Sequence, residues 1–228
     1  YASAGQSLNL NWKWEDIAKH LKINVRDSMS ALDIKNNLLG VCDQMYLFEP
    51  GDDTTVCVLK AVKPKKVKLF TGPPSHKEDD AKVVHELMNN ADIRIVSGGT
   101  TSQIVARELG VEVKSSTEIY DKEVPPIAYI QGVDLVTEGV LTLSKTIDRL
   151  KSLSKSLDSD IFKAKDGASQ MAKLLYSASH IKLLVGRSLN IANAESSFQR
   201  DLELRLHVVG ELEKILVKLG KIVTVEYY

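Results

Sequence analysis

Two adjacent carboxylates stand on a tight turn in the first third of the chain. Asp52 and Asp53 follow Pro50 and Gly51, and an apolar segment starts at Thr54. Carboxylate oxygens held close together are ligands that hard divalent cations such as Mg²⁺ and Mn²⁺ prefer. The pattern therefore predicts a metal site, and its alternative is an ordinary Pro-Gly turn with solvated acids.

Small residues also gather in four turns farther along the chain, each directly after a predicted strand. The turns are residues 71–72, 98–101, 137–139 and 186–187. In open parallel sheets, ligands bind at the carboxyl ends of the strands, where such turns converge. The four turns together predict a pocket for a small anionic ligand or a phosphate group, and plain strand-to-helix connections are the alternative.

The turn of residues 98–101 has the composition best suited to binding. Gly98 and Gly99 allow a ligand to approach the backbone closely, and Thr100 and Thr101 add hydroxyl groups. The helix after this turn offers free N–H groups and the positive end of its dipole to an anion. The turn is neither a Walker loop nor a complete G-x-G-x-x-G motif, so it does not identify a nucleotide.

Two charged residues in the other turns complete the predicted pocket. Arg187 comes directly after a strand and is the candidate clamp for an anion. Glu138 could bind a ribose hydroxyl, a metal or an amine, or it could only favour the N-terminus of the helix that begins at Val140. Arg107 lies about two helical turns beyond the glycines, and its side chain is expected to face away from the pocket.

The elements that must position these residues alternate between strand and helix from residue 67 onward. Strands are predicted at residues 67–70, 93–96, 111–113, 133–136, 181–185 and 222–226, and helices at 75–89, 102–109, 140–153, 168–177 and 202–219. This alternation is typical of a mostly parallel sheet with helices on both faces. We therefore expect an α/β (Rossmann-like) domain over residues 64–228. Its last helix is expected to cover the sheet, and the seam of a homodimer is the alternative.

Residues 1–63 have a different pattern. Apolar residues at three- and four-residue spacing predict a helix over residues 12–21 and a second one from Ser30 to Met45. The alternating, β-branched segment of residues 54–62 predicts a strand. Cys42 lies on the apolar face of the second helix and Cys57 lies in the strand, so both are expected to be small core residues.

The order of these elements resembles the end of a metal-dependent (PPM, type 2C) protein phosphatase domain of the stage II sporulation protein E kind, an α/β/β/α sandwich. The resemblance rests on Trp12 and Trp14, the two helices and the Gly-Asp-Asp-x-Thr-Val turn. It implies that Asp52 is a metal ligand and that Asp53 and Thr55 orient the turn. It also implies hydrolysis of phosphoserine or phosphothreonine in a phosphoprotein substrate, with two Mn²⁺ or Mg²⁺ ions that activate a bridging water.

The resemblance also covers the start of the chain and three segments of the predicted second domain. Residues 1–11 are similar to the segment directly after a Ser-Asp-Gly motif in that family, so we expect the chain to start just downstream of another ligand and to be inactive alone. Residues 98–101, 125–127 and 135–139 read Gly-Gly-Thr-Thr, Pro-Pro-Ile and Leu-Val-Thr-Glu-Gly. They resemble a carboxyl-terminal region of unassigned activity found after some phosphatase domains of this kind.

Composition excludes several other classes of protein. The 228 residues are 43% apolar and 26% charged, which is typical of a packed globular chain of one or two domains. Thirty basic and thirty acidic side chains leave no net field to attract nucleic acid. No apolar run reaches the length of about 18 residues that would span a membrane. With two cysteines and no signal peptide, a cytoplasmic location is expected.

These patterns together predict the carboxyl-terminal part of a metal-dependent serine/threonine phosphatase, residues 1–63, joined to a regulatory or ligand-binding domain, residues 64–228. The alternative is an α/β sensor that binds a small anion or a nucleotide and catalyses nothing.

Overall fold

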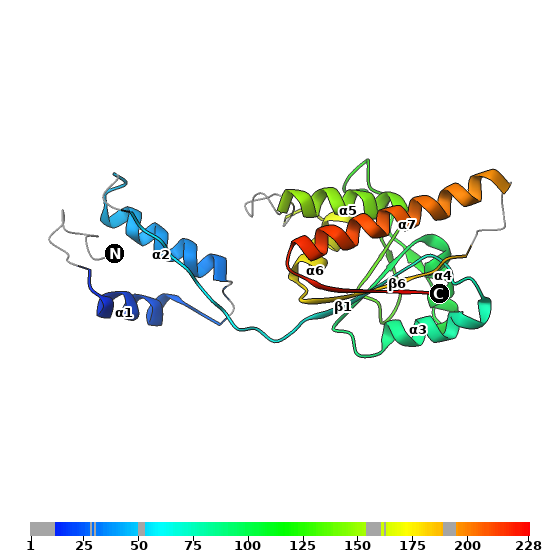
Figure 1. Cartoon of the computed structure of the whole chain (residues 1–228), viewed down its shortest axis with the longest axis horizontal. Helices are drawn as coiled ribbons and strands as arrows, with labels where there is room; N and C mark the ends of the chain where they lie inside the picture. Colours follow the sequence, from blue (N-terminus) through cyan, green and yellow to red (C-terminus); the bar gives the residue numbers. More distant parts are fainter. Residues whose placement is uncertain are drawn as a thin grey trace. The chain divides into compact units, whose positions relative to one another are not determined.

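The chain divides into two compact units, Tyr1–Lys63 and Pro64–Tyr228. The computed structural model describes residues 12–27, 29, 31–49, 53–153, 161, 163–188 and 195–228, with the backbone alone for residues 195–201. Figure 1 shows the order of the helices and strands along the chain.

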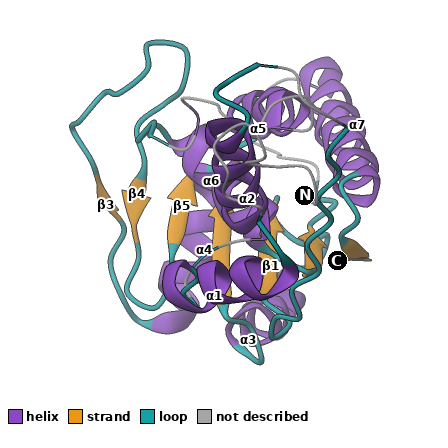
Figure 2. Ribbon diagram, turned by 90° about the vertical axis from the view of Figure 1, so that its left-hand side faces the viewer, coloured by secondary structure: helices purple, strands orange, loops and turns teal. Residues whose placement is uncertain are grey.

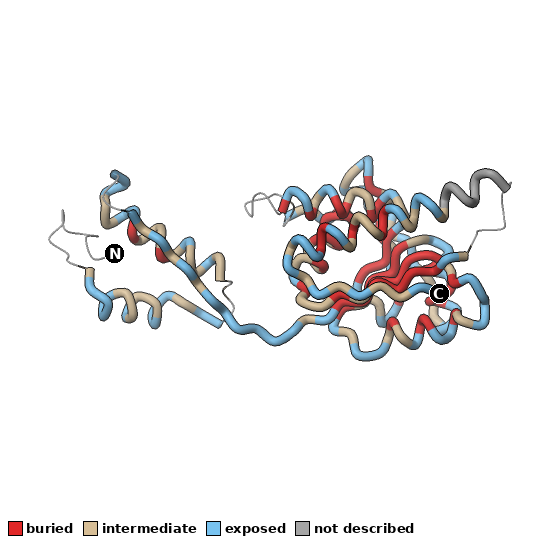
Figure 3. The backbone as a smooth tube through the Cα atoms, viewed as in Figure 1, coloured by how far each residue is buried: buried red, intermediate tan, exposed pale blue. Residues whose placement is uncertain are grey.

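The first unit contains two helices, α1 (Trp14–Asn24) and α2 (Ala31–Met45), which confirm the two predicted helices. The backbone N–H of Lys13 donates to Asp16 Oδ2 (2.9 Å) at the start of α1. His20 Nε2 and Asn37 Oδ1, 2.7 Å apart, join the two helices by a hydrogen bond. Among the described residues of this unit, only Leu38 and Cys42 are buried, so the two helices enclose little apolar surface (Figure 3).

The predicted strand of residues 54–62 is not formed. The described part of the segment, from residue 53, has no strand pairing and runs beside the helices instead. Thr54 Oγ1 lies 3.5 Å from Cys42 Sγ, and Lys60 Nζ donates to the carbonyl oxygens of Asp27 (2.5 Å) and Met29 (2.6 Å). A strand needs a neighbouring strand for its backbone hydrogen bonds, and the described residues of this unit supply none. The β-branched, alternating sequence of residues 54–62 was therefore not sufficient to form a strand. Cys57, expected in the core because of that strand, is exposed, whereas Cys42 on α2 is buried as expected.

The second unit is built on one seven-stranded sheet in the order β3-β4-β5-β2-β1-β6-β7. Its parallel strands are β1 (Lys66–Thr71), β2 (Ile93–Ser97), β5 (Leu135–Thr137), β6 (His180–Val185) and β7 (Ile222–Tyr227), and its antiparallel strands are β3 (Lys114–Ser115) and β4 (Ala128–Tyr129). Figure 2 shows β3 and β4 beside β5. The prediction of a strand at residues 111–113 is wrong, because strand pairing in this region is limited to the two residues of β3.

Helices cover both faces of the sheet, which confirms the predicted fold class for this unit. The short 3₁₀ helix η2 (Lys77–Asp79) leads into α3 (Asp80–Met88), which shares one hydrophobic core with α4 (Gly99–Leu109). On the other face, α5 (Val140–Leu153), α6 (Gly167–Ser177) and α7 (Glu195–Lys218) share the second core. None of the described helices is long and apolar enough to cross a membrane.

Apolar burial holds these layers together. Leu69, Ile95 and Leu183 come from three adjacent strands, and their side chains are 0% exposed. Full burial of each such side chain contributes about 1.5–3 kcal/mol. The near-continuous apolar sequence of these strands follows from their position, since strands covered by helices on both faces have no side that contacts water.

A charged network crosses the α3 face of the sheet. Lys68 is only 8% exposed, and its ammonium donates to Glu86 Oε1 (2.7 Å) and to the carbonyl oxygens of Glu86 (2.6 Å) and Asn89 (2.7 Å). Lys182 joins Glu86 (2.8 Å) to Glu226 (2.6 Å). The hydrogen bonds from Lys182 and Lys68 lower the pKa of Glu86, and those from Lys182 and Tyr228 lower the pKa of Glu226. The network thus links β1, β6 and β7 to α3.

Candidate ligand-binding site

A cavity of about 580 Å³ opens at the carboxyl ends of β1, β2 and β5. These strands end at one level, because Thr71 is the register partner of Ser97, and Ser97 is the register partner of Thr137. The turns after these strands line the cavity through residues 71–73, 97–101 and 138–141, together with Pro125, Leu204 and Arg205. Gly98, Gly99, Thr100, Thr101 and Glu138, which the sequence singled out from two separate turns, all belong to this lining.

The turn between β2 and α4 depends on Gly98. Its φ of 118° lies in a region that side chains rarely adopt, so a glycine is required there. The N–H of Gly98 donates to the carbonyl oxygen of Thr137 (2.8 Å), and its own carbonyl oxygen accepts from Ser102 N (2.9 Å) and Ser102 Oγ (2.8 Å). Helix α4 then begins at Gly99 with no side-chain cap, so its first N–H groups are directed toward the cavity end of the sheet.

Buried hydroxyl groups join the three turns to one another. Thr101 is 1% exposed, and its Oγ1 accepts a hydrogen bond from the N–H of Gly72 (2.9 Å), which ties the turn after β1 to α4. The hydroxyls of Ser97 (2.8 Å) and Thr137 (2.9 Å) both donate to the carbonyl oxygen of Glu138, which ties the turn after β5 to β2. The cavity wall is therefore a bonded frame that needs little ordering when a ligand binds.

Glu138 is the acidic group of the cavity. Its side chain is exposed, and its carboxylate makes no hydrogen bond or ion pair with any residue that the structure describes. The two carboxylate oxygens lie 3.9 and 4.0 Å from the point that a Cβ atom on Gly99 would occupy. The carboxylate is thus placed over the first residue of α4, at the positive end of the helix dipole.

Arg205, on α7, is the basic group of the cavity. Its Nη1 lies 2.6 Å from the point that a Cβ atom on Gly72 would occupy, and it donates to the carbonyl oxygen of Gly186 (3.2 Å). Arg187, the clamp expected from the sequence, is not among the lining residues. Its guanidinium lies over the ring of Tyr227, 5.5 Å from the ring centre. No local spacing in the sequence links Arg205 to the turns, because it reaches them only when α7 packs across the sheet.

The fourth predicted turn, residues 186–187, does not belong to the cavity because the chain itself fills the space there. A Cβ atom on Gly186 would lie 2.1 Å from the carbonyl oxygen of Pro73 and 2.2 Å from that of Gly72. The N–H of Ser188 donates to the same oxygen of Pro73 (3.0 Å). The strand order reverses between β1 and β6, where sheets of this topology often bind ligands. In this unit the open space lies one strand away.

Apolar side chains complete the wall. Leu141 (52% exposed), Leu204 (50% exposed) and Pro125 come from α5, α7 and the loop before β4. Apolar side chains combined with a few fixed polar groups are a common composition for small-molecule sites. Arg107 lies away from this wall, as expected, because its guanidinium pairs with Asp80 of α3 (2.5 Å).

A second hollow, of about 740 Å³, lies at the start of α6 and contains none of the residues expected from the sequence. Its charges are largely engaged in bonds of the fold. Arg149 pairs with Asp121 (3.0 Å), and the Asp166 side chain caps α6 by accepting from Ser169 N (2.9 Å). The cavity at β1, β2 and β5 is therefore the stronger candidate.

The predicted metal turn is only partly described. Asp52 lies outside the described residues, and Asp53 is exposed. No group of three or more His, Cys, Asp or Glu side chains that could hold a metal ion occurs among the described residues. The Mn²⁺ or Mg²⁺ site at Asp52 and Asp53 therefore stays a prediction.

Comparisons of the chain with protein-family models, with curated proteins and with solved structures found no match. A functional assignment therefore depends on the geometry of the cavity and on the sequence patterns.

Proposed function

We propose that residues 64–228 form a module that binds a small phosphorylated or otherwise anionic molecule in the cavity at the ends of β1, β2 and β5. The observation that carries this proposal is the convergence of three turns and α7 on one cavity, which joins the residues of 98–101 to Glu138 and Arg205. A guanidinium can bind a phosphate or carboxylate through two parallel hydrogen bonds, so Arg205 supplies the group that an anion requires.

The lining favours binding over catalysis. Among the described residues that line the cavity, Glu138 and Arg205 are the only charged ones, and none is His, Cys, Lys or Asp. The hydroxyls of Ser97 and Thr101 are engaged in bonds that hold the turns together. Nucleophilic catalysis by a hydroxyl or thiol is usually assisted by a His or Lys base, and the described lining contains neither residue type. A sensor or regulatory role fits this wall better than a reaction.

Ligand-induced stabilisation tests the proposal. Inorganic phosphate, sugar phosphates and nucleotides are added separately to the protein, and its melting temperature is measured by differential scanning fluorimetry. A molecule that binds only the folded state raises that temperature in proportion to its affinity. At least one phosphorylated compound should do so, and a panel with no effect at all would refute the proposal.

Two arginine variants locate the site. Arg205→Gln should weaken binding of the active compound by about tenfold or more, since hydrogen bonds to a charged partner are lost. Arg187→Gln removes the same charge from a residue outside the lining and should leave the affinity unchanged. Affinities are measured by calorimetry well below the melting temperature of each variant. Any loss of stability from the missing Arg205–Gly186 hydrogen bond then leaves the protein folded and does not lower the measured affinity. Equal losses in both variants would place the ligand elsewhere.

A second function is favoured by the surface of the unit Tyr1–Lys63. Residues 54, 56 and 58 are half-buried and residues 53, 55 and 57 are exposed, which is the alternation of a strand that pairs with a neighbour. Trp14 (74%), Phe48 (78%) and Leu59 (94%) are strongly exposed. Large exposed apolar side chains are expected on a surface that another layer covers. This supports the proposal that residues 1–63 are the last layer of a metal-dependent serine/threonine phosphatase domain.

In that proposal Asp52 and Asp53 contribute carboxylate oxygens to Mn²⁺ or Mg²⁺, which would activate water for attack on a phosphoserine or phosphothreonine. Two aspartates do not supply enough ligands for two ions, so further ligands must come from outside the described residues. The complete product of the gene should hydrolyse a phosphoserine peptide when Mn²⁺ is present. Asp52→Asn should abolish this activity, and Asp43→Asn, an exposed aspartate on α2, should retain it. Equal activity in both variants would refute the metal role of Asp52.

A further inference from the structure

We infer that the ligand of the cavity is a phosphorylated sugar or polyol, whose anionic group binds Arg205 and whose hydroxyl groups donate hydrogen bonds to Glu138. The inference depends on the proposed binding function and specifies the chemical class of the ligand. Its basis is the positions of the acid and the base relative to α4.

The charges of the cavity decide where an anion can bind. The sequence alone places it at the N-terminus of α4, above the two glycines. In the structure both carboxylate oxygens of Glu138 lie about 4 Å from the Cβ position of Gly99, at that same place. Two negative charges at such a separation repel one another, most strongly where solvent is partly excluded. The anion is therefore expected at the other side of the cavity, beside Arg205 and Gly72.

The Glu138 carboxylate is stabilised by the positive end of the α4 dipole, so a cation from the ligand is not needed to balance its charge. Its oxygens nevertheless make no hydrogen bond with a described residue. A carboxylate can accept hydrogen bonds at about four lone-pair positions, and ligand hydroxyl groups are donors of the right kind. Glu138 is thus suited to recognise hydroxyl groups.

The separation of Arg205 and Glu138 sets the minimum size of the ligand. Arg205 lies at Gly72, after β1, and Glu138 lies at Gly99, after the neighbouring strand β2. Adjacent strands are about 4.8 Å apart, so the anionic and hydroxyl groups of the ligand must be separated by at least a similar span. Inorganic phosphate is too small to bridge both groups. A sugar phosphate carries its phosphate and its ring hydroxyls several bonds apart, and its carbon atoms can contact Leu141 and Leu204, which line the same cavity.

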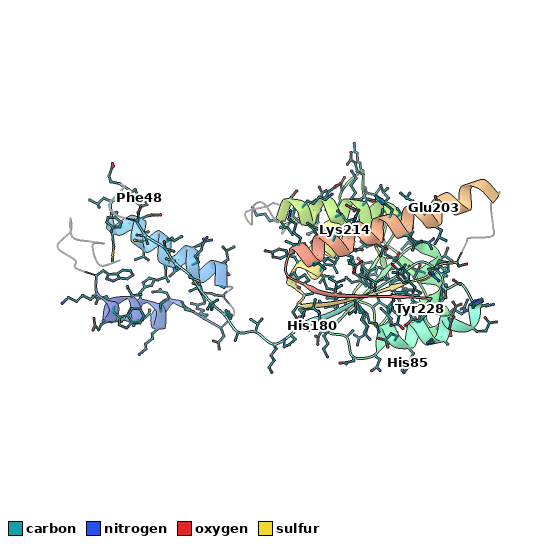
Figure 4. All side chains as sticks on the ribbon, viewed as in Figure 1. Phe48, His85, His180, Glu203, Lys214 and Tyr228 are labelled. Atoms are coloured by element: carbon teal, nitrogen blue, oxygen red, sulfur yellow. The ribbon has the colours of Figure 1, made fainter. Side chains whose placement is uncertain are left out.

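The test compares three compounds on the whole chain by calorimetry: inorganic phosphate, ribose 5-phosphate and phosphoethanolamine. Ribose 5-phosphate should bind at least about tenfold more tightly than inorganic phosphate, because hydrogen bonds to a charged acceptor are strong. Glu138→Gln should remove most of that advantage and leave the affinity for inorganic phosphate equal or slightly higher. Glu203→Gln serves as the matched control, since Glu203 lies on α7 and outside the cavity lining (Figure 4).

The remaining outcomes separate failure of this inference from failure of the proposed function. If phosphate and ribose 5-phosphate bind equally, or if Glu138→Gln tightens both by the same factor, Glu138 only repels anions and hydroxyl recognition is refuted. If phosphoethanolamine binds best, Glu138 recognises an amine, which also refutes it. In each of these cases the cavity still binds an anion. If none of the three compounds or the wider phosphorylated panel binds, the proposed function itself fails.

Discussion

The carboxyl edge of the sheet has two halves that use the same kinds of residue in opposite ways. Beside β2 and β5, glycine and hydroxyl residues surround a cavity, and the carboxylate of Glu138 has no partner among the described residues. Between β1 and β6, Gly186 lies against the backbone of Pro73, and no space for a ligand is left. A glycine turn after a parallel strand therefore indicates that other atoms lie close to the backbone there. The neighbouring turn decides whether those atoms belong to a ligand or to the chain itself.

The charges of the cavity differ from those on the α3 face of the sheet. On that face, Lys182 joins Glu86 to Glu226, so the charges stabilise the fold. In the cavity, the Glu138 carboxylate makes no hydrogen bond or ion pair with a described residue and does not contribute to the fold in this way. A carboxylate without a described partner beside a preformed cavity is typical of binding sites, whereas ion pairs between elements are typical of structural contacts.

Gly186→Ala should have the largest effect, because it adds an atom to the filled half. The new Cβ would lie within 2.2 Å of three backbone atoms, which cannot move without displacing the turn after β1. We expect the free energy of unfolding to fall by about 3 kcal/mol, as for a strongly overpacked core. Urea denaturation monitored by circular dichroism measures it. Gly210→Ala, with no atom within 4 Å of the new Cβ, is the control and should stabilise α7 by up to about 1 kcal/mol. Equal midpoints would show that the filled half can relax.

Gly99→Val should weaken ligand binding and leave stability almost unchanged, because it adds atoms to the open half. Gly99 is exposed, and the nearest atom to its Cβ position is 3.9 Å away, so the free energy of unfolding should change by no more than about 0.5 kcal/mol. The branched side chain would occupy cavity volume and lower the affinity for ribose 5-phosphate by about tenfold. Gly99→Ala should have a smaller effect in the same direction. An unchanged affinity in the valine variant would show that the ligand does not approach α4.

Lys182→Met should lower the free energy of unfolding much less than Gly186→Ala does, and its effect should depend on pH. The pKa values of Glu86 and Glu226 are lowered in the folded protein from their ordinary value of 4.5. Their stabilisation is therefore present above pH 4.5 and is lost as the pH falls through the lower folded pKa values. Near pH 7 the variant should lose about 0.5–1 kcal/mol, as expected for partly exposed ion pairs. Urea midpoints at a series of pH values should show this loss shrinking below pH 4.5.

The control for that series is Lys214→Met, which removes a lysine from the exposed surface of α7 (Figure 4). Among the described residues, Lys214 forms an ion pair only with Glu211 on the same helix, so its removal should change the midpoint less than removal of Lys182 does. A loss in Lys182→Met that stays constant from pH 7 to pH 3 would mean that packing of the lysine stem, and not its ion pairs, stabilises the α3 face.

Much of the fold could be predicted because the patterns that specify it are local. Helix α5 spans the residues that its apolar spacing predicted, and β2 and β6 differ from their predictions by a single residue at one end. The prediction of a strand at residues 54–62 was wrong because strand formation does not depend on local sequence alone. The alternation of these residues matched a strand, but strand formation also needs a partner, and the described residues of the first unit provide none.

The candidate site, like the fold, could be predicted where it depends on neighbouring residues and not where it depends on long-range contacts. The turns at residues 98–101 and 138 could be predicted from the sequence, because a glycine turn at the end of a strand is specified by adjacent residues. That Arg205, and not Arg187, lies in the cavity, and that Gly186 closes the space between β1 and β6, became clear from the folded structure. Both features depend on how α7 packs across the sheet and on which turns come into contact. The residues involved are far apart in the sequence, so no local pattern of residue types predicts such contacts.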